Sequence, residues 1–236
     1  INGYFLSPWL YWHKNMYSMS QGKQQDQRIA LASIRDNEYF FDYMWRKARD
    51  PKRYYEALLM YGARRGGKTA IMSSKELHDM ITIPHCRAQL IATNTKDLGE
   101  LSGYLETAVI HLPPALGFTV NVNSDKEFKI GLKKNAQTPL DYAVMDILNL
   151  ESGKKAGTQK TAGGTPDSVA FDEIGKGEVK KSYLTLRPAL QGGSRTTALM
   201  AGTGNGEEDL SKDAEDLLRN YAAYGVLPMD WDKLEE

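Results

Sequence analysis

The 236-residue sequence predicts an α/β fold built on a mainly parallel central sheet, with helices covering both faces. Short apolar runs of strand length alternate along the chain with longer segments whose apolar residues recur at helical spacing. A glycine-rich segment at 62–69 also lies directly between a predicted strand at 55–61 and a predicted helix at 68–83. Alternation of this kind is typical of parallel sheets with helices on both faces.

The remaining elements follow from the same patterns. Residues 29–49 carry apolar side chains at helical spacing, and Asp50-Pro51 ends this helix because the residue before a proline avoids helical backbone. Apolar or alternating runs predict strands at 88–93, 142–148, 168–171 and 197–201, and an edge hairpin of strands at 118–122 and 127–132. Helical spacing predicts helices at 97–112, 178–190 and 207–224, and the Gly-, Lys- and Thr-rich residues 151–166 predict a loop.

The glycine-rich segment reads Gly62-Ala63-Arg64-Arg65-Gly66-Gly67-Lys68-Thr69 and fits the pattern G-x-x-x-x-G-K-[ST] of a P-loop. Glycines let backbone N–H groups close around phosphates, and the start of a helix adds positive potential. In this setting Lys68 reaches the β- and γ-phosphates and Thr69 holds Mg²⁺. The segment therefore predicts a binding site for ATP and Mg²⁺, to which all eight residues contribute.

A second motif, residues 168–173, is an apolar run that ends in two acids. In P-loop NTPases a strand beside the P-loop strand ends in an aspartate that holds Mg²⁺, which is the role expected of Asp172. Glu173 follows directly and is expected to polarise the attacking water as a general base. The adjacent acids indicate nucleotide hydrolysis by a P-loop NTPase of the ASCE type.

A third element follows the predicted strand at 197–201, where Gly202-Thr203-Gly204 places a hydroxyl group between glycines. If this strand lies beside the P-loop strand, Thr203 can sense the γ-phosphate and relay its loss; an ordinary glycine-rich turn is the alternative. Asp172 follows Lys68 by 104 residues, which leaves room for two or three strand–helix units between the motifs. A gap of this length is typical of motor ATPases that act on nucleic acid.

Composition narrows the class only slightly. Lys+Arg and Asp+Glu both number 30, so net charge argues neither for nor against nucleic acid. The single cysteine excludes an intramolecular disulfide, and neither a membrane span nor a signal peptide is present in the sequence. Because the chain begins at Ile1 rather than Met, we expect it to be part of a longer protein.

With these three elements in order, the chain resembles the ATPase domain of the large terminase subunit of tailed bacteriophages. The resemblance covers most of the chain. It rests on Ala63-Arg64-Arg65 in the P-loop, Thr165-Pro166-Asp167 before the acidic strand, Arg187-Pro188-Ala189-Leu190 after it, the turn at Thr203 and, more weakly, the aromatic opening at 3–15. The family packages double-stranded DNA into a preformed capsid by hydrolysing ATP, and cuts the DNA with a separate nuclease domain.

By position, the resemblance implies that Lys68 and Thr69 bind phosphate and Mg²⁺, that Asp172 completes the Mg²⁺ site and that Glu173 activates water. It also makes Thr203 the coupling residue. The implied partners are double-stranded DNA, the portal protein, the small terminase subunit and further copies of the chain in a ring, in the host cytoplasm and without a membrane. The nuclease domain is expected to be absent from residues 1–236.

The resemblance leaves one residue open. Many terminases carry an arginine upstream of the catalytic glutamate that acts on the ATP of the neighbouring subunit, and this chain has Ala162 at that position. Lys160 or Arg187 can substitute, or Arg64 can suffice by acting on the ATP of its own subunit. We favour Arg64, with Arg65 pointing away towards a neighbour or solvent.

These motifs divide the chain into a lead-in at 1–53 and a P-loop ATPase core at 54–236. Residues 1–20 are rich in Trp and Tyr and either pack on the core or form a base-stacking surface, of which we favour packing. The favoured function is ATP hydrolysis that drives DNA packaging. A helicase-like or other nucleic-acid-dependent P-loop ATPase and a P-loop scaffold without turnover are the alternatives.

Overall fold

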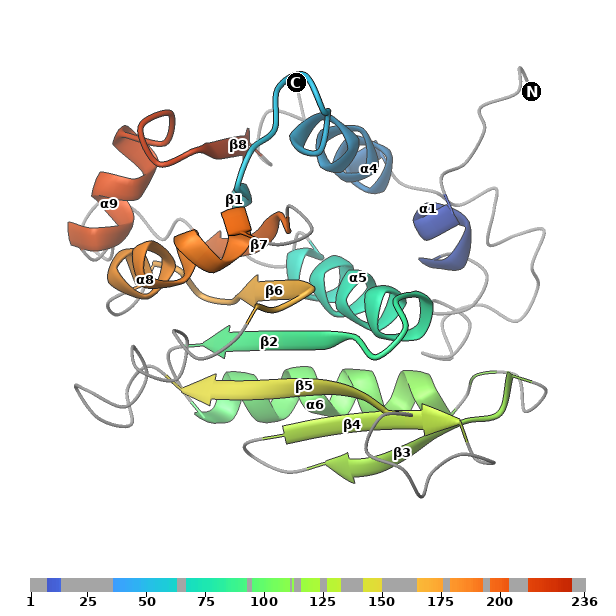
Figure 1. The fold of residues 1–236 in the computed structure, drawn as a ribbon. Helices are drawn as coiled ribbons and strands as arrows, with labels where there is room; N and C mark the ends of the chain where they lie inside the picture. Colours follow the sequence, from blue (N-terminus) through green and yellow to red (C-terminus); the bar gives the residue numbers. More distant parts are fainter. Residues whose placement is uncertain are drawn as a thin grey trace, which may run out of the picture.

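The computed structural model describes residues 8–13, 36–62, 67–92, 95–110, 112, 116–123, 127–132, 142–149, 165–175, 179–192, 196–203 and 212–230. An eight-stranded sheet in the order β3-β4-β5-β2-β6-β7-β1-β8 forms its centre (Figure 1). The strands are β1 (Ala57–Gly62), β2 (Arg87–Ala92), β3 (Phe118–Asn123), β4 (Glu127–Leu132), β5 (Tyr142–Asn149), β6 (Ser168–Phe171), β7 (Ala198–Thr203) and β8 (Val226–Asp230). Strand β4 runs antiparallel to both of its neighbours, and the other pairs are parallel. The predicted mainly parallel sheet and its edge hairpin are therefore confirmed.

Helices cover both faces of this sheet, as predicted. They are α1 (Pro8–Trp12), α4 (Asp36–Ala48), α5 (Lys68–Thr82), α6 (Thr95–Ile110), α8 (Val179–Gly192) and α9 (Lys212–Arg219). Side chains alternate between two cores along the central strands, so that Leu58 and Met60 of β1 pack with α1, α4, α5 and α6. Ala57 and Leu59, which point to the other face, pack with α8 and α9. None of the described helices is both long and apolar enough to cross a membrane.

The described part of the aromatic lead-in packs against this core. Trp9 and Leu10 of α1 are buried, and the Trp9 ring meets Phe41 of α4 edge-on at 4.8 Å between centroids. His13, just after α1, also packs here. Its Nδ1 lies 2.7 Å from the Ser74 hydroxyl of α5, and its Nε2 lies 3.3 Å from the Glu38 carboxylate of α4. Trp9 and Leu10 thus belong to the core, whereas Tyr4 and Tyr17 lie outside the described part.

The C-terminal end differs from the prediction of one helix over 207–224. Helix α9 ends at Arg219, and residues 220–225 form tight turns that end at Gly225, whose φ is +66°. Strand β8 follows and pairs with β1 at the edge of the sheet, which was not predicted. Pro228 within β8 argued against a strand in the sequence, because proline cannot donate a ladder hydrogen bond. It is tolerated only where one side of the strand is unpaired.

Candidate nucleotide site

The P-loop begins and ends with geometry that fits its predicted role. Strand β1 ends at Gly62 and α5 starts at Lys68, so the loop connects a buried strand to a helix N-terminus. Gly67 precedes the helix with φ +80°, and its carbonyl accepts the first helical hydrogen bond, from the Ile71 N–H at 3.0 Å. Beyond its chain neighbours, no described residue has an atom within 4 Å of a Cβ built on Gly67, so the left-handed backbone rather than crowding requires glycine there.

Lys68 joins the two ends of the loop. Its side chain is buried, and its ammonium group donates to the Gly62 carbonyl at 2.9 Å. A lysine ammonium held over the end of β1 lies where a P-loop binds the phosphates of its nucleotide. Ala63, Arg64, Arg65 and Gly66 lie outside the described residues.

The acidic pair lies in a turn that is fixed at both ends. The Asp172 N–H donates to the Ile91 carbonyl of β2 at 2.8 Å, and the Ile174 N–H donates to the Ala201 carbonyl of β7 at 3.0 Å. Between these anchors the Glu173 N–H donates to the Asp172 carboxylate at 3.0 Å. The turn therefore spans both strands that flank β6.

Glu173 has an unusual backbone conformation, with φ +54°. A non-glycine residue in this region costs on the order of 1–3 kcal/mol and persists where the surrounding structure imposes it. Asp172 is buried whereas Glu173 is partly exposed, so the two carboxylates differ in environment. A buried acid beside a partly exposed one suits the predicted division between a metal ligand and a base that contacts water.

The three motifs meet at one edge of the sheet. Strands β6, β7 and β1 are parallel neighbours, so their carboxyl ends lie side by side, and Thr203 pairs with Gly62 at the start of the P-loop. The prediction that the Thr203 strand lies beside the P-loop strand is confirmed. The expectation that the acidic strand also lies beside it is wrong, because β7 lies between β6 and β1.

Gly202 links the acidic turn to the end of β7, a contact that the sequence did not predict. A Cβ on Gly202 would lie 2.6 Å from Cγ1 of Ile174, so the Ile174 side chain occupies the space that glycine leaves. A glycine within a strand often marks such a close approach, which was the available signal. Residue 174 follows the acidic pair and residue 202 precedes Thr203, so this contact joins two of the three motifs.

Arg187, one of the alternatives for a trans-acting arginine, is engaged elsewhere. It lies on α8 and forms an ion pair with Glu56, with its Nη2 3.1 Å from Oε1, and the Gln191 amide donates to the same oxygen at 2.6 Å. Glu56 directly precedes β1, at the edge opposite the P-loop. This contact favours a structural role for Arg187 within its own chain.

We expect Arg187→Ala to lower the free energy of unfolding by about 3 kcal/mol, because it leaves the buried Glu56 carboxylate without its cation. Urea denaturation of the variant and the parent chain measures this loss. Arg219→Ala is the matched control, since its ion pair with Glu215 is exposed and is worth at most about 1 kcal/mol. Equal losses in the two variants would contradict the structural role of the Glu56 ion pair.

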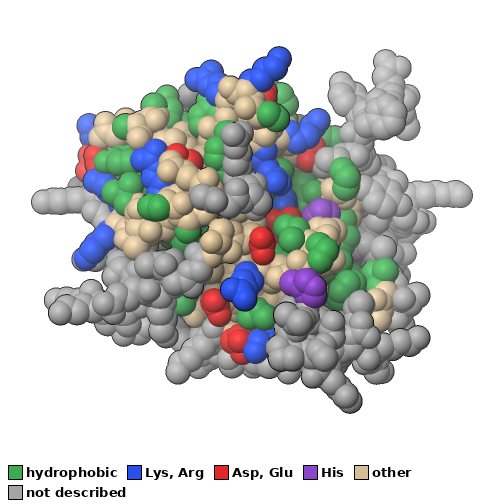
Figure 2. Space-filling model, in the orientation of Figure 1, with side chains coloured by type: hydrophobic (Ala, Val, Ile, Leu, Met, Phe, Trp, Pro, Cys, Tyr) green, Lys and Arg blue, Asp and Glu red, His purple; other side chains and the backbone are tan. Residues whose placement is uncertain are grey.

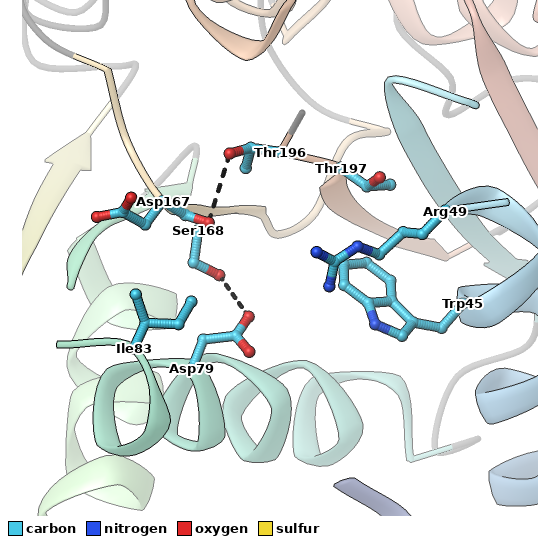
Figure 3. A pocket seen from close by; sticks show the side chains of 8 residues that line it. All are labelled: Trp45, Arg49, Asp79, Ile83, Asp167, Ser168, Thr196 and Thr197. Atoms are coloured by element: carbon cyan, nitrogen blue, oxygen red, sulfur yellow. Dashed lines mark hydrogen bonds between the residues drawn. The ribbon is translucent and has the colours of Figure 1, made fainter. Parts of the chain in front are cut away.

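A cavity of about 270 Å³ lies away from this site (Figure 3). Ser168 at the start of β6, Thr196 and Thr197 before β7, and Asp79 near the end of α5 contribute to its wall. Because these residues mark the amino ends of the strands, the cavity lies at the edge opposite the P-loop. It is therefore distinct from the candidate nucleotide site.

Solved structures of several phage proteins have a similar fold. One large terminase from a thermophilic bacteriophage, which we call the thermophilic-phage terminase, aligns with a TM-score of 0.59 and 15% identity over 83% of this chain and 45% of its own. The chain has the fold of a large terminase ATPase domain. The ATPase domain of Thermus phage P74-26 aligns with a TM-score of 0.56 and 13% identity over 79% of this chain and 80% of its own. The HK97 bacteriophage large terminase aligns with a TM-score of 0.58 and 14% identity over 84% of this chain and 39% of its own.

The similarity to these three proteins is one of fold, at 13–15% sequence identity. The chain spans less than half the length of the thermophilic-phage terminase and of the HK97 protein. Structures of the thermophilic-phage terminase have been solved in complex with ADP and with ATP-gamma-S. No family model and no curated protein sequence matches the chain.

Proposed function

We propose that this chain hydrolyses ATP to drive translocation of double-stranded viral DNA into a procapsid. The observation that carries the proposal is the edge where the Lys68 ammonium, the Asp172–Glu173 turn and the Gly62–Thr203 pair meet. The complexes of the thermophilic-phage terminase with ADP and ATP-gamma-S, a protein of the same fold, support nucleotide binding by this chain. Among the described residues, nothing favours the helicase-like alternative.

The residues present fit Mg²⁺-ATP. A threonine hydroxyl at the second position of α5 and a buried aspartate at the end of β6 supply oxygen ligands, as Mg²⁺ prefers, although the described residues contain no group of three metal-binding side chains. Two protein ligands are the expected number, because Mg²⁺ in such sites takes its remaining ligands from water and phosphate. When bound, Mg²⁺ would neutralise developing charge on the β- and γ-phosphates. Thr69 and Asp172 are the residues that would hold it.

In the proposed mechanism, Lys68 binds the β- and γ-phosphates and Glu173 takes a proton from the water that attacks the γ-phosphate. Arg64 stabilises the transferred phosphoryl group within the same subunit, and Gly62, Gly66 and Gly67 let backbone N–H groups approach the phosphates. ATP and water yield ADP and inorganic phosphate. We further propose that the portal protein, the small terminase subunit and a ring of identical chains are the partners during packaging.

Steady-state ATP hydrolysis by the full chain, measured with and without double-stranded DNA, tests the function. Hydrolysis that duplex DNA stimulates is the expected result. Nucleotide binding without hydrolysis in either condition would leave only the scaffold alternative. Stimulation by single-stranded but not by duplex DNA would instead identify a helicase-like motor.

We expect Lys68→Ala to weaken binding of a non-hydrolysable ATP analogue at least about tenfold, because charge-assisted contacts to phosphate are among the stronger hydrogen bonds. Fluorescence titration with a labelled analogue measures the dissociation constant. Lys75→Ala is not a suitable control because it removes a buried ion pair, so the exposed Lys181→Ala serves instead. Unchanged affinity in Lys68→Ala would contradict the P-loop assignment.

Thr203→Val tests the coupling role, since it keeps the side-chain shape and removes the hydroxyl group. We expect nucleotide affinity to persist and DNA translocation to fall more than ATP hydrolysis. A packaging assay and a phosphate-release assay on the same preparation give the ratio of the two rates. An equal loss of both rates would make Thr203 a residue of catalysis or folding.

A further inference from the structure

Basic side chains concentrate at one place on a chain whose charges otherwise balance. Lys+Arg and Asp+Glu both number 30 in the whole sequence, yet residues 46–53 contain five cations and one acid. The cations are Arg46, Lys47, Arg49, Lys52 and Arg53. All five are exposed, and we call residues 46–53 the α4 basic surface. Figure 2 shows Lys and Arg side chains along the upper rim of the molecule, where Figure 1 places α4 and the connection to β1.

Charge is segregated across α4. Two of its carboxylates, those of Glu38 and Asp42, are buried, on the side that packs against the rest of the molecule. Asp42 forms an ion pair with Arg46 at 3.0 Å and so neutralises one cation. Within the described part of the chain, no acidic side chain forms an ion pair with Lys47, Arg49, Lys52 or Arg53. The outer side of this helix end therefore carries a net positive charge.

Aromatic rings rather than acids support several of these cations. The Arg49 guanidinium lies 5.4 Å from the centre of the Trp45 ring, and that of Arg53 lies 5.6 Å from the centre of the Tyr55 ring. A cation over a ring keeps its charge and its N–H donors available to a ligand. Such support restrains the side chains without neutralising them.

The turn after α4 is itself fixed. Asp50, the one acid of the α4 basic surface, accepts the Lys52 N–H on its carboxylate at 2.8 Å, and its carbonyl accepts the Arg53 N–H at 3.0 Å. The acid thus shapes the turn that displays two of the cations. Because both hydrogen bonds involve backbone donors, changing the Lys52 or Arg53 side chain leaves the turn intact.

Exposed tyrosines extend this surface along the helix. Tyr39 is 40% and Tyr43 is 54% exposed, and with Lys47 they recur every four residues on one side of α4. The Lys47 ammonium lies 6.0 Å from the centre of the Tyr43 ring. Tyrosine hydroxyls and basic side chains both bind phosphate oxygens. From Tyr39 to Lys47 the helix rises roughly 12 Å, so the donors form a line rather than converging on one point.

A line of donors suits a ligand with repeated charges. Duplex DNA carries one phosphate per about 1.7 Å of its axis, so an extended basic surface neutralises several phosphates at once. A single phosphate or a mononucleotide would instead require converging donors. The surface also precedes β1 and therefore lies at the edge of the sheet opposite the candidate nucleotide site, where it leaves the P-loop open.

We propose that the α4 basic surface contacts the phosphate backbone of duplex DNA. The inference rests on the proposed function for the identity of the polymer. It assigns the DNA-contacting role to Lys47, Arg49, Lys52 and Arg53, with Tyr39 and Tyr43 as additional phosphate donors. The contact is independent of DNA sequence, because only backbone groups of the DNA are involved.

Fluorescence anisotropy of a labelled duplex with the full chain tests the proposal, using the double variant Lys52→Glu/Arg53→Glu. We expect affinity near 0.1 M salt to fall at least about tenfold, and the slope of log affinity against log salt to decrease by about 1.8 for two lost phosphate contacts. The control Lys181→Glu/Arg219→Glu makes the same change in net charge at exposed positions of α8 and α9. It should stay within about twofold of the parent chain, because its charges lie away from the surface.

The outcomes separate this proposal from the proposed function. DNA binding by the parent chain with equal affinity and slope in the surface variant would overturn the α4 assignment and leave the ATPase function intact. A parent chain that hydrolyses ATP and binds no duplex would overturn both the DNA part of the function and the α4 assignment. Binding of poly-glutamate, measured by the same method, tests an acidic protein as the alternative ligand. If the surface variant lost poly-glutamate binding and kept duplex binding, the surface would be assigned to an acidic protein and the proposal would be overturned. Hydrolysis without DNA should be equal in all three proteins, which verifies folding.

Discussion

Glu173→Gln is expected to leave nucleotide affinity unchanged and to lower steady-state ATP hydrolysis roughly 10²–10⁴-fold, the usual contribution of a positioned general base. The amide has the size of the carboxylate but cannot accept the proton of the attacking water. The backbone at this position is fixed by hydrogen bonds to β2 and β7, so the substitution should not move the side chain. A phosphate-release assay and an ATP-binding titration on one preparation give the two quantities.

The backbone of Glu173 provides a matched control. Because φ is +54°, Glu173→Gly removes the carboxylate and also removes the strain of a side chain in the left-handed region. We expect the glycine variant to be at least as stable as the parent chain in urea denaturation and as inactive as Glu173→Gln. Loss of activity would then be due to the carboxylate and not to unfolding. Parent-like hydrolysis in either variant would remove Glu173 from catalysis.

The placement of the P-loop motif between a strand and a helix, and of the acidic pair after a strand, could be predicted because these signals are local. A glycine at φ +80° before α5 and a pair of acids after an apolar run can be recognised within a few residues. The prediction of strand order was less successful, since the acidic strand was expected beside the P-loop strand and β7 lies between them. Pairing between strands depends on contacts over more than a hundred residues, which periodicity along the chain does not report.

Contacts between distant segments account for the other differences. The ion pair of Arg187 with Glu56 and the contact of Ile174 with Gly202 each join elements that only the folded sheet brings together. Strand β8 was missed because Pro228 is tolerated there only through its edge position. The roles of Arg64 and Arg65 stay predictions, because both lie outside the described residues.

A buried acidic cluster, which the sequence did not predict, is expected to make the free energy of unfolding depend strongly on pH. Glu76 of α5 is fully buried, and burial, followed by the nearby Asp79 charge, raises its pKa from 4.5 to about 8. The Ser168 hydroxyl of β6 lies 3.0 Å from the Glu76 carboxyl and 3.0 Å from the Asp79 carboxylate. A hydroxyl has one proton, so it can donate to only one of them.

The proton count identifies the neutral partner. Burial opposes ionisation of Asp79, but its ion pair with Lys75, hydrogen bonds from Lys75 and Ser168, and the His78 ring 3.6 Å away lower the Asp79 pKa overall. Ser168 therefore donates its hydrogen bond to the ionised Asp79 and accepts a hydrogen bond from the neutral Glu76 carboxyl. The second Glu76 oxygen has no hydrogen-bond partner among the described residues, which is tolerable for a neutral carboxyl and costly for a charged one.

The neutral Glu76 makes stability depend on pH with a definite sign. Between pH 4.5 and about 8 the folded chain keeps a proton that the unfolded chain has released, so the free energy of unfolding falls as pH rises through this range. The pKa difference corresponds to roughly 5 kcal/mol at most. Asp79 acts in the opposite direction, because its lowered pKa contributes stability that is lost only as pH falls below the ordinary value of 3.8. The two contributions therefore occupy separate pH ranges.

Glu76→Gln should remove this dependence, because the glutamine amide can donate to Ser168 as neutral glutamate does and has no proton to lose. We expect the variant to match the parent chain near pH 5 and to exceed its free energy of unfolding by several kcal/mol near pH 9. Urea denaturation across this range measures the difference. Glu215→Gln, at a side chain 46% exposed, is the control and should run parallel to the parent chain. Parallel profiles for Glu76→Gln and the parent would mean that Glu76 is ionised in the fold, and that Ser168 donates to it rather than to Asp79.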